Sequence, residues 1–187
     1  MNRRSFFRWI PALGTLAAIP TGLYAQQTRL PIRTIPGTGE TLPIIGLGSS
    51  KAVNQILDSG PGPLAAVLRM LVSHGGRLID TTPYPAENEA EFGRILQAPD
   101  LRDELFLALK INTMDEQTGI QQVEQARRLF GRQAFDLLQV MSLRGLHAHW
   151  PNLRGWKEAG ETRYIGVTVS NYEDFDDLEE FITTEAV

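Results

Sequence analysis

The fold of this chain is decided by the stretch Arg-Leu-Ile-Asp-Thr-Thr-Pro-Tyr-Pro-Ala-Glu-Asn-Glu-Ala-Glu-Phe-Gly, which runs from Arg77 to Gly93. The apolar pair Leu78-Ile79 predicts a short buried strand that ends with Asp80 at its carboxyl end. A proline-containing turn follows, and then a helix. Asn88 with Glu91 three residues later has the pattern of a capping box, so we expect that helix to begin at Asn88.

Two roles are open for Asp80 on this pattern alone. In α/β folds ligands bind at the carboxyl ends of the strands, so a carboxylate at such an end is a candidate for chemistry. The alternative is that Asp80 only holds the following turn through local hydrogen bonds. The rest of the chain decides between them.

Strand and helix patterns alternate along the chain. Apolar runs predict strands at residues 42–48, 78–80, 105–111, 134–140 and 163–168. Helical periodicity predicts helices at residues 64–72, from 88 onward, at 118–130, at 152–159 and from 172 onward; Thr118 with Gln121 forms a second capping-box pattern. A polar lead at residues 26–39 predicts a hairpin or an extended arm.

Strict alternation of strands and helices predicts one α/β domain with a parallel sheet and right-handed crossovers. Either a doubly wound open sheet or part of a (β/α)8 barrel fits this order. The first strand is not followed by Gly-x-Gly-x-x-Gly, so the pattern does not favour a Rossmann dinucleotide fold.

Composition excludes several classes of function. The net charge is -4 and the sequence contains no cysteine. A basic nucleic-acid-binding surface, disulfides and thiolate chemistry are therefore not expected. The histidines are His74, His147 and His149. His74 precedes two glycines, which is typical of a helix end, and the other two adjoin Trp150-Pro151, which predicts a loop rather than a metal site.

The N-terminus has the pattern of a signal peptide. Arg3-Arg4 precedes Ser5-Phe6-Phe7, a moderately apolar run from Trp9 to Tyr24 follows, and Ala25 marks a cleavage position. Paired arginines in this setting are similar to a twin-arginine signal. We therefore expect residues 1–25 to direct export by the twin-arginine machinery to a bacterial periplasm, leaving a mature domain at residues 26–187.

Several positions together resemble the aldo-keto reductase family. Asp80, Lys110 at the end of the third strand, and the run Asp136-Leu-Leu-Gln-Val have the family's order and spacing. The stretch Arg154-Gly-Trp-Lys-Glu-Ala-Gly-Glu-Thr-Arg-Tyr-Ile-Gly-Val-Thr168 is similar to a typical stretch of that family, and the resemblance covers roughly residues 33–182 without gaps.

The resemblance implies a TIM barrel that transfers a hydride from NADPH to an aldehyde or ketone. The family's catalytic tetrad is Asp, Tyr, Lys and His. The tyrosine is the general acid, a neighbouring lysine ammonium lowers its pKa, and the aspartate holds the lysine. Asp80 and Lys110 match two of the four positions.

The other two positions depart from the family. Pro85 occupies the tyrosine position and is followed by Ala86, while Tyr84 lies one residue early between two prolines. Met141 occupies the histidine position, and a thioether donates no hydrogen bond. We therefore expect impaired or absent reductase activity, with Tyr84 as the candidate displaced acid.

For the cofactor, the resemblance implies that NADP(H) is held by Asp80, Thr168, Ser170 and Asn171. Val169 replaces a polar residue usual in the family. The alternative for Ser170 and Asn171 is that they cap the last helix.

Length predicts a partial barrel. A complete (β/α)8 barrel takes about 250 residues, so we expect a truncated barrel with about five of its eight strand–helix units. Open sheet edges are self-association sites. A non-catalytic fragment that completes its barrel with another chain is therefore the alternative to a reductase.

Overall fold

A computed structural model describes residues 30–185, and the predicted signal peptide at residues 1–25 lies outside them. Five strands form one parallel sheet and neighbour one another in chain order: β3 (Gly46–Gly48), β4 (Leu78–Thr81), β5 (Phe106–Ile111), β6 (Phe135–Met141) and β7 (Thr162–Thr168). The helices are α1 (Ser50–Asn54), α2 (Ile56–Ser59), α3 (Gly62–Ser73), α4 (Ala86–Leu96), α5 (Glu116–Phe130), α6 (Leu146–Glu158), the 3-10 turn η1 (Tyr172–Asp174) and α7 (Phe175–Glu185).

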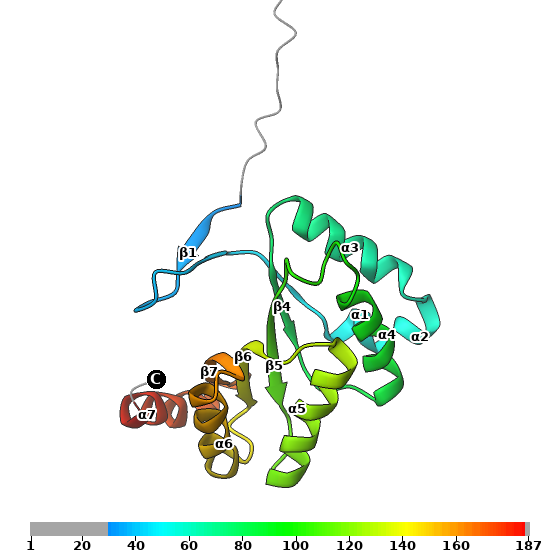
Figure 1. Ribbon diagram of the computed structural model, residues 1–187. Coiled ribbons are helices and arrows are strands. Elements are labelled where there is room, and N and C mark those ends of the chain that lie inside the picture. The colour runs from blue at the N-terminus through cyan, green and yellow to red at the C-terminus, as the bar shows by residue number, and fades with distance from the viewer. Residues whose placement is uncertain (1–29, 186–187) are drawn as a thin grey trace, which may run out of the picture.

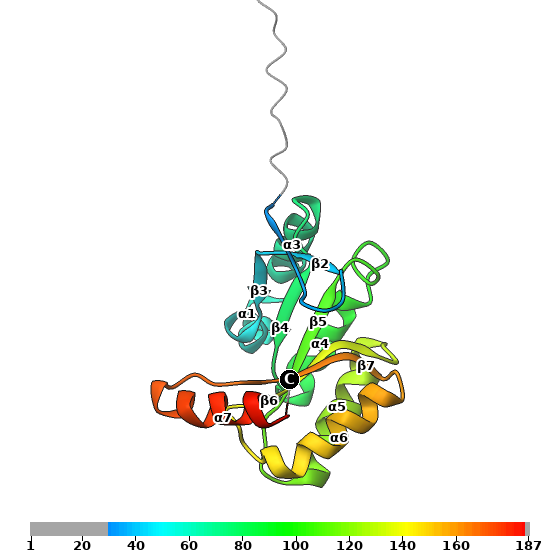
Figure 2. The same ribbon diagram turned by 90° about the vertical axis from the view of Figure 1, so that its left-hand side faces the viewer.

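The strand order distinguishes the two architectures that the sequence left open. A doubly wound sheet reverses its strand order at a switch point, with helices on both faces. Here the order does not reverse, and helices α3 to α6 pack around the outer side of the curved sheet (Figures 1 and 2). The predicted α/β class and partial (β/α)8 barrel are confirmed, with five strand–helix units in the described part of the chain.

The two faces of the sheet carry different side chains. Alternate residues of a strand point to opposite faces. Ile79, Leu107 and Leu138 are buried on the helix-covered side, each 0% exposed. On the other face, the register aligns Asp80 with Ala108, and Lys110 with Gln139. Polar residues therefore line the inner face toward the carboxyl ends of the strands.

An aromatic cluster joins α4 and α5 to the sheet. The rings of Phe92 and Phe130 meet edge to face at a centroid distance of 5.5 Å, and Phe130 meets Phe135 in the same way at 6.4 Å. All three side chains are at most 1% exposed. Burying such rings is among the largest favourable contributions to a core, so this cluster fixes the helices that flank the Asp80 strand.

A hairpin precedes the sheet, and its first strand lies in the polar lead at residues 26–39 while its second strand lies beyond it. Its strands are β1 (Ile32–Thr34) and β2 (Thr41–Pro43), paired antiparallel. The predicted single strand at 42–48 was wrong: Pro43, which lacks a backbone N–H, ends β2, and β3 begins separately at Gly46. A Cβ on Gly46 would lie 2.9 Å from the Leu78 Cβ, so glycine permits this close approach.

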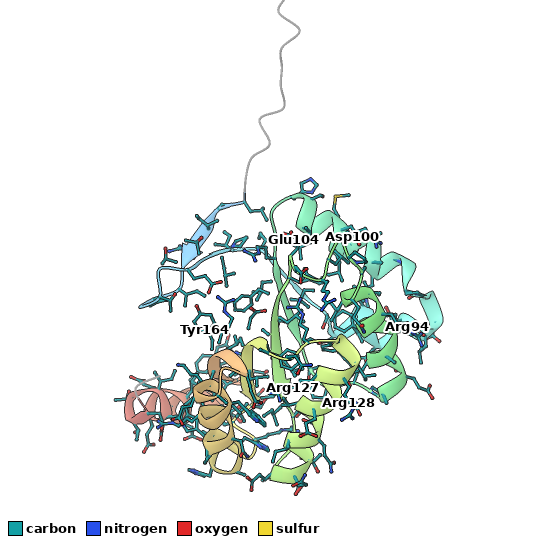
Figure 3. All side chains as sticks on the ribbon, in the orientation of Figure 1. Arg94, Asp100, Glu104, Arg127, Arg128 and Tyr164 are labelled. Carbon is teal, nitrogen blue, oxygen red and sulfur yellow. The ribbon has the colours of Figure 1, made fainter. Side chains whose placement is uncertain are left out.

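Glu40 attaches the hairpin to β7. Its carboxylate accepts a hydrogen bond from the Tyr164 hydroxyl at 2.6 Å and forms an ion pair with Arg163. Figure 3 shows Tyr164 between the hairpin and the sheet. The hydrogen bond from Arg163, followed by that from Tyr164, lowers the pKa of Glu40 below its usual value.

Both predicted capping boxes were wrong. Helix α4 begins at Ala86, after Pro85, and Asn88 is buried inside its first turn, where its amide donates to the Val53 carbonyl at 3.0 Å. Helix α5 is capped by Asp115, whose carboxylate accepts from the Thr118 backbone N–H at 2.8 Å. In each case the helix begins two residues earlier in the chain than the predicted cap.

Helix α6 begins six residues earlier than predicted, at Leu146, so His147 and His149 lie in a helix and not in a loop. Gly145, at φ 64°, makes the turn that starts it. His149 is 1% exposed, and its Nε2 lies 2.8 Å from the Thr113 carbonyl oxygen. The helix accommodates Pro151 at the loss of one backbone hydrogen bond.

The helix predicted from residue 172 onward is confirmed by η1 and α7, and α7 exposes part of its apolar surface. Phe181 packs edge to face on Trp150 at 4.8 Å, whereas Phe175 and Ile182 are 48% and 42% exposed. Among the helices of residues 30–185, none is long and apolar enough to cross a membrane.

Candidate active site at the carboxyl end of the sheet

Asp80 and Lys110 form an ion pair at the carboxyl ends of β4 and β5. The Lys110 ammonium donates to the Asp80 carboxylate. The side chain of Lys110 is 12% exposed and that of Asp80 is 47% exposed, so the pair lies at the boundary between the inner face and solvent. The structure therefore brings together Asp80 and Lys110, two of the predicted site residues.

The register places Lys110 between Thr82, which follows β4, and Gln139 of β6. Thr81 pairs with Leu109, which places Thr82, the residue directly after β4, beside Lys110. On the other side, Lys110 pairs with Gln139 of β6. Parallel strands lie about 4.8 Å apart, so the three side chains form a short polar row across the inner face. Thr82 could have been found from the sequence, because it follows Asp80 by two residues and shares its face.

A contact between Thr82 and Met141 joins the end of β4 to the end of β6. The Thr82 hydroxyl donates to the Met141 sulfur at 3.7 Å, and both residues are half-buried. The loop that follows Met141 is strained: Ser142 and Leu143 have φ values of 52° and 54°. Left-handed conformations of such residues are unfavourable and cluster at functional sites.

The Tyr84 hydroxyl bonds to Ser49. Tyr84 is 8% exposed, and its hydroxyl lies 2.9 Å from the Ser49 hydroxyl. Ser49 donates its own proton to the Asp80 carbonyl oxygen at 3.1 Å. Because a serine hydroxyl has one proton, Tyr84 must be the donor in the Tyr84–Ser49 bond. The structure thus directs the tyrosine proton to Ser49, and among the described residues no hydrogen bond joins Tyr84 to Lys110.

Glu89 fixes the backbone on which Tyr84 lies. One carboxylate oxygen accepts from the Tyr84 backbone N–H at 3.2 Å, and the other accepts from the Gln125 amide at 2.5 Å. Glu89 is 1% exposed, and this burial raises the pKa of its carboxyl group above the usual value. Sequence reasoning missed both Ser49 and Glu89, since their partners lie in other elements.

The predicted cofactor residues lie at the carboxyl end of β7. Thr168 pairs in register with Met141 and is half-buried, so it faces the same side as the ion pair. Ser170 and Asn171 are exposed. Asn171 occupies the N-cap position of η1 but its side chain makes no capping hydrogen bond. The capping alternative therefore has no side-chain bond in its support.

The described residues hold no group of three or more His, Asp or Glu side chains that could bind a metal ion. Within residues 30–185, the polar groups at this end of the sheet are instead an ion pair, hydroxyls and amides.

Comparison with known proteins identifies the fold's relatives. The sequence matches the aldo/keto reductase family over residues 41–187. The chain belongs to the aldo/keto reductase family. No curated protein matches it significantly.

Solved aldo-keto reductases share the fold. A protein assigned as an aldo-keto reductase from Pseudomonas aeruginosa is 21% identical with a TM-score of 0.63, covering 73% of this chain and 59% of that one. An aldo/keto reductase from Brucella melitensis is 21% identical with a TM-score of 0.61, covering 84% and 60%. The holo form of an aldo-keto reductase from Bacillus halodurans is 16% identical with a TM-score of 0.57, covering 74% and 50%. This aldo/keto reductase chain therefore spans about half to three-fifths of the length of these structures.

The hydroxyl of Tyr84 is expected to serve the stability of this aldo/keto reductase domain and not proton transfer. In a Tyr84→Phe variant, Ser49 keeps its bond to the Asp80 carbonyl, so only one neutral hydrogen bond is lost. We expect the free energy of unfolding to fall by about 1 kcal/mol, measured by urea denaturation. Any carbonyl reduction by the chain should be unchanged. A large loss of reduction with unchanged stability would instead establish Tyr84 as the displaced acid.

Proposed function

We propose that this chain carries an NADP(H)-dependent carbonyl reductase site whose activity is weak. The observation that carries this proposal is the Asp80–Lys110 ion pair on adjacent parallel strands, in which the Asp80 side chain is 47% exposed. Family membership supports the cofactor class, and the half-buried Thr168 with the exposed Ser170 and Asn171 supports a place for the nicotinamide carboxamide, which both donates and accepts hydrogen bonds.

The residues present account for part of the reductase chemistry. NADPH, when bound, supplies the hydride. The Lys110 ammonium stabilises negative charge that develops on the carbonyl oxygen, and Asp80 holds that ammonium in place. The activity is proposed to be weak because neither Tyr84 nor Met141 supplies a proton to the carbonyl oxygen. Tyr84 donates its proton to Ser49, and Met141, at the position where the family has histidine, has no proton to donate.

A thermal melt of the full chain with and without NADPH tests this proposal. A ligand that binds only the native state at a hundred times its dissociation constant adds about 2.7 kcal/mol. For a chain of this size we expect a rise in Tm of about 5–10 °C. Slow NADPH oxidation with an aldehyde panel should be lost in Lys110→Ala. A broad transition indifferent to NADPH would contradict a cofactor site.

A second function, assembly with another chain, is favoured by one surface. Among the described strands, β7 pairs only with β6, which leaves one of its edges open. Beyond it, Tyr172, Phe175 and Ile182 are 88%, 48% and 42% exposed. Open edges with apolar neighbours associate. Sedimentation of the same sample separates the two candidates: a monomer that binds NADPH supports the reductase site, and a stable oligomer that does not bind NADPH supports assembly.

A further inference from the structure

The contact between Thr82 and Met141 is the least satisfied polar contact at the candidate active site. A thioether sulfur is a weak hydrogen-bond acceptor, and the 3.7 Å separation between the Thr82 hydroxyl oxygen and the Met141 sulfur is long. A carbonyl oxygen is a much better acceptor than a thioether. The Thr82 hydroxyl therefore gains by exchanging sulfur for a carbonyl oxygen that enters the inner face.

Lys110 follows the last register pair on the neighbouring strand. That pair is Thr81–Leu109, and the next residues on the two segments are Thr82 and Lys110. A lysine ammonium has three N–H donors, and among the described residues the hydrogen-bond partner of Lys110 is Asp80. Two kinds of donor, a hydroxyl and an ammonium, are thus placed by the register at the same end of the sheet and on the same face.

Met141 contributes an apolar and flexible side chain next to Thr82. It is half-buried at the end of β6, and the strained residues Ser142 and Leu143 follow it. Methionine fits irregular shapes, and its sulfur makes favourable contacts with aromatic rings. A substrate with its carbonyl oxygen on Thr82 would place its adjoining group against this thioether.

We propose that Thr82 binds the carbonyl oxygen of an aldehyde substrate. This inference rests on the proposed NADP(H)-dependent function and adds a residue that positions the substrate in that site. The hydroxyl positions the oxygen against Lys110 in place of the donors that Tyr84 and Met141 do not supply.

The strand itself provides a matched control. Thr81 and Thr82 are adjacent threonines on opposite faces of one strand end. Thr81 is 1% exposed, and its hydroxyl oxygen has no hydrogen-bond partner in the structure. Replacing Thr81 by valine removes a hydroxyl of the same chemistry without touching the inner face, and no stabilising hydrogen bond is lost.

The test is calorimetric titration of benzaldehyde into the full chain saturated with NADP⁺, which binds without turnover. Thr82→Val is expected to weaken benzaldehyde binding about three- to tenfold, the worth of one neutral hydrogen bond. Thr82→Ser and Thr81→Val should bind benzaldehyde like the wild type. NADP⁺ affinity, titrated separately, should be the same in all variants.

Three results would overturn the inference. One is equal benzaldehyde affinity in Thr82→Val and the wild type, and another is equal weakening by Thr81→Val. The third is NADP⁺ binding without any benzaldehyde binding by the wild type, which leaves the cofactor part of the proposed function intact. A wild-type chain that binds no NADP⁺ contradicts the proposed function itself, and the inference falls with it.

Discussion

Replacing Pro85 by tyrosine and Met141 by histidine in the same chain is expected to raise NADPH-dependent aldehyde reduction at least about a hundredfold. A positioned general acid contributes about 10²–10⁴ in rate. The double variant places a tyrosine and a histidine at the two positions where the family has them, next to the Asp80–Lys110 pair that is already in place. The measurement is the initial rate of NADPH oxidation with benzaldehyde.

The backbone accepts the first of these changes. Pro85 has φ −51° and ψ 140°, values that tyrosine adopts readily, and the residue is exposed at the start of α4. Met141 is half-buried, and its register partner Thr168 shows that it faces the inner side of the sheet. A histidine there has room to reach the substrate side.

Two further variants separate a restored acid from an unspecific effect. Adding Lys110→Met to the double variant should remove the gain, because the new tyrosine then lacks the ammonium that lowers its pKa. Adding Tyr84→Phe should leave the gain intact, since Tyr84 donates to Ser49. If the double variant binds NADPH yet reduces benzaldehyde no faster than the wild type, the Asp80–Lys110 pair does not form a working reductase centre.

Local patterns predicted the strands of this fold well where burial is continuous. The run at residues 105–111 is apolar except for Lys110, because both faces of β5 are buried along most of its length. The run at 42–48 is equally apolar but forms two separate strands, since Pro43 cannot continue a ladder and Gly46 must approach Leu78 closely. The hydrophobic pattern alone therefore does not predict the division of this run into two strands.

Helix starts were harder to predict because their partners are distant in sequence. Asn88 has the residue type of a cap, yet its amide bonds the carbonyls of Val53 and Asn54 across the interface with α1. His149 has the residue type of a loop or a ligand, yet it fills a space left by Gly119, where a Cβ would lie 2.4 Å from its ring. Only tertiary packing decides such positions.

The candidate site was predicted in the same uneven way. Asp80 and Lys110 lie at strand ends, and strand ends meet at one edge of a parallel sheet, so their proximity follows from the pattern. The hydrogen-bond partner of the Tyr84 hydroxyl is Ser49, which lies 35 residues earlier. The contact of Thr82 with Met141 spans 59 residues. Neither contact leaves a local signal.

Gly93→Ala is expected to lower the free energy of unfolding by about 2–4 kcal/mol, the largest stability effect of a single added methyl group in this domain. A Cβ at Gly93 would lie 2.0 Å from the Leu129 carbonyl oxygen and 2.7 Å from its carbon. The obstacle is the backbone of α5, which cannot rotate away as a side chain could. Separating α4 from α5 would also loosen the edge-to-face contact of Phe92 with Phe130.

Gly155→Ala is the matched control, because the same change occurs inside a helix with the opposite surroundings. Nothing lies within 4 Å of a Cβ at Gly155 in α6. Alanine is favoured over glycine in a helix interior by about 1 kcal/mol, so this variant should be more stable by up to that amount. Thermal melts should therefore move in opposite directions, with Tm lower by about 5–10 °C for Gly93→Ala and higher by about 2–4 °C for Gly155→Ala. Equal gains in both variants would show that α4 and α5 do not approach as closely as the structure places them, and the support of the strand end that carries Asp80 would need another explanation.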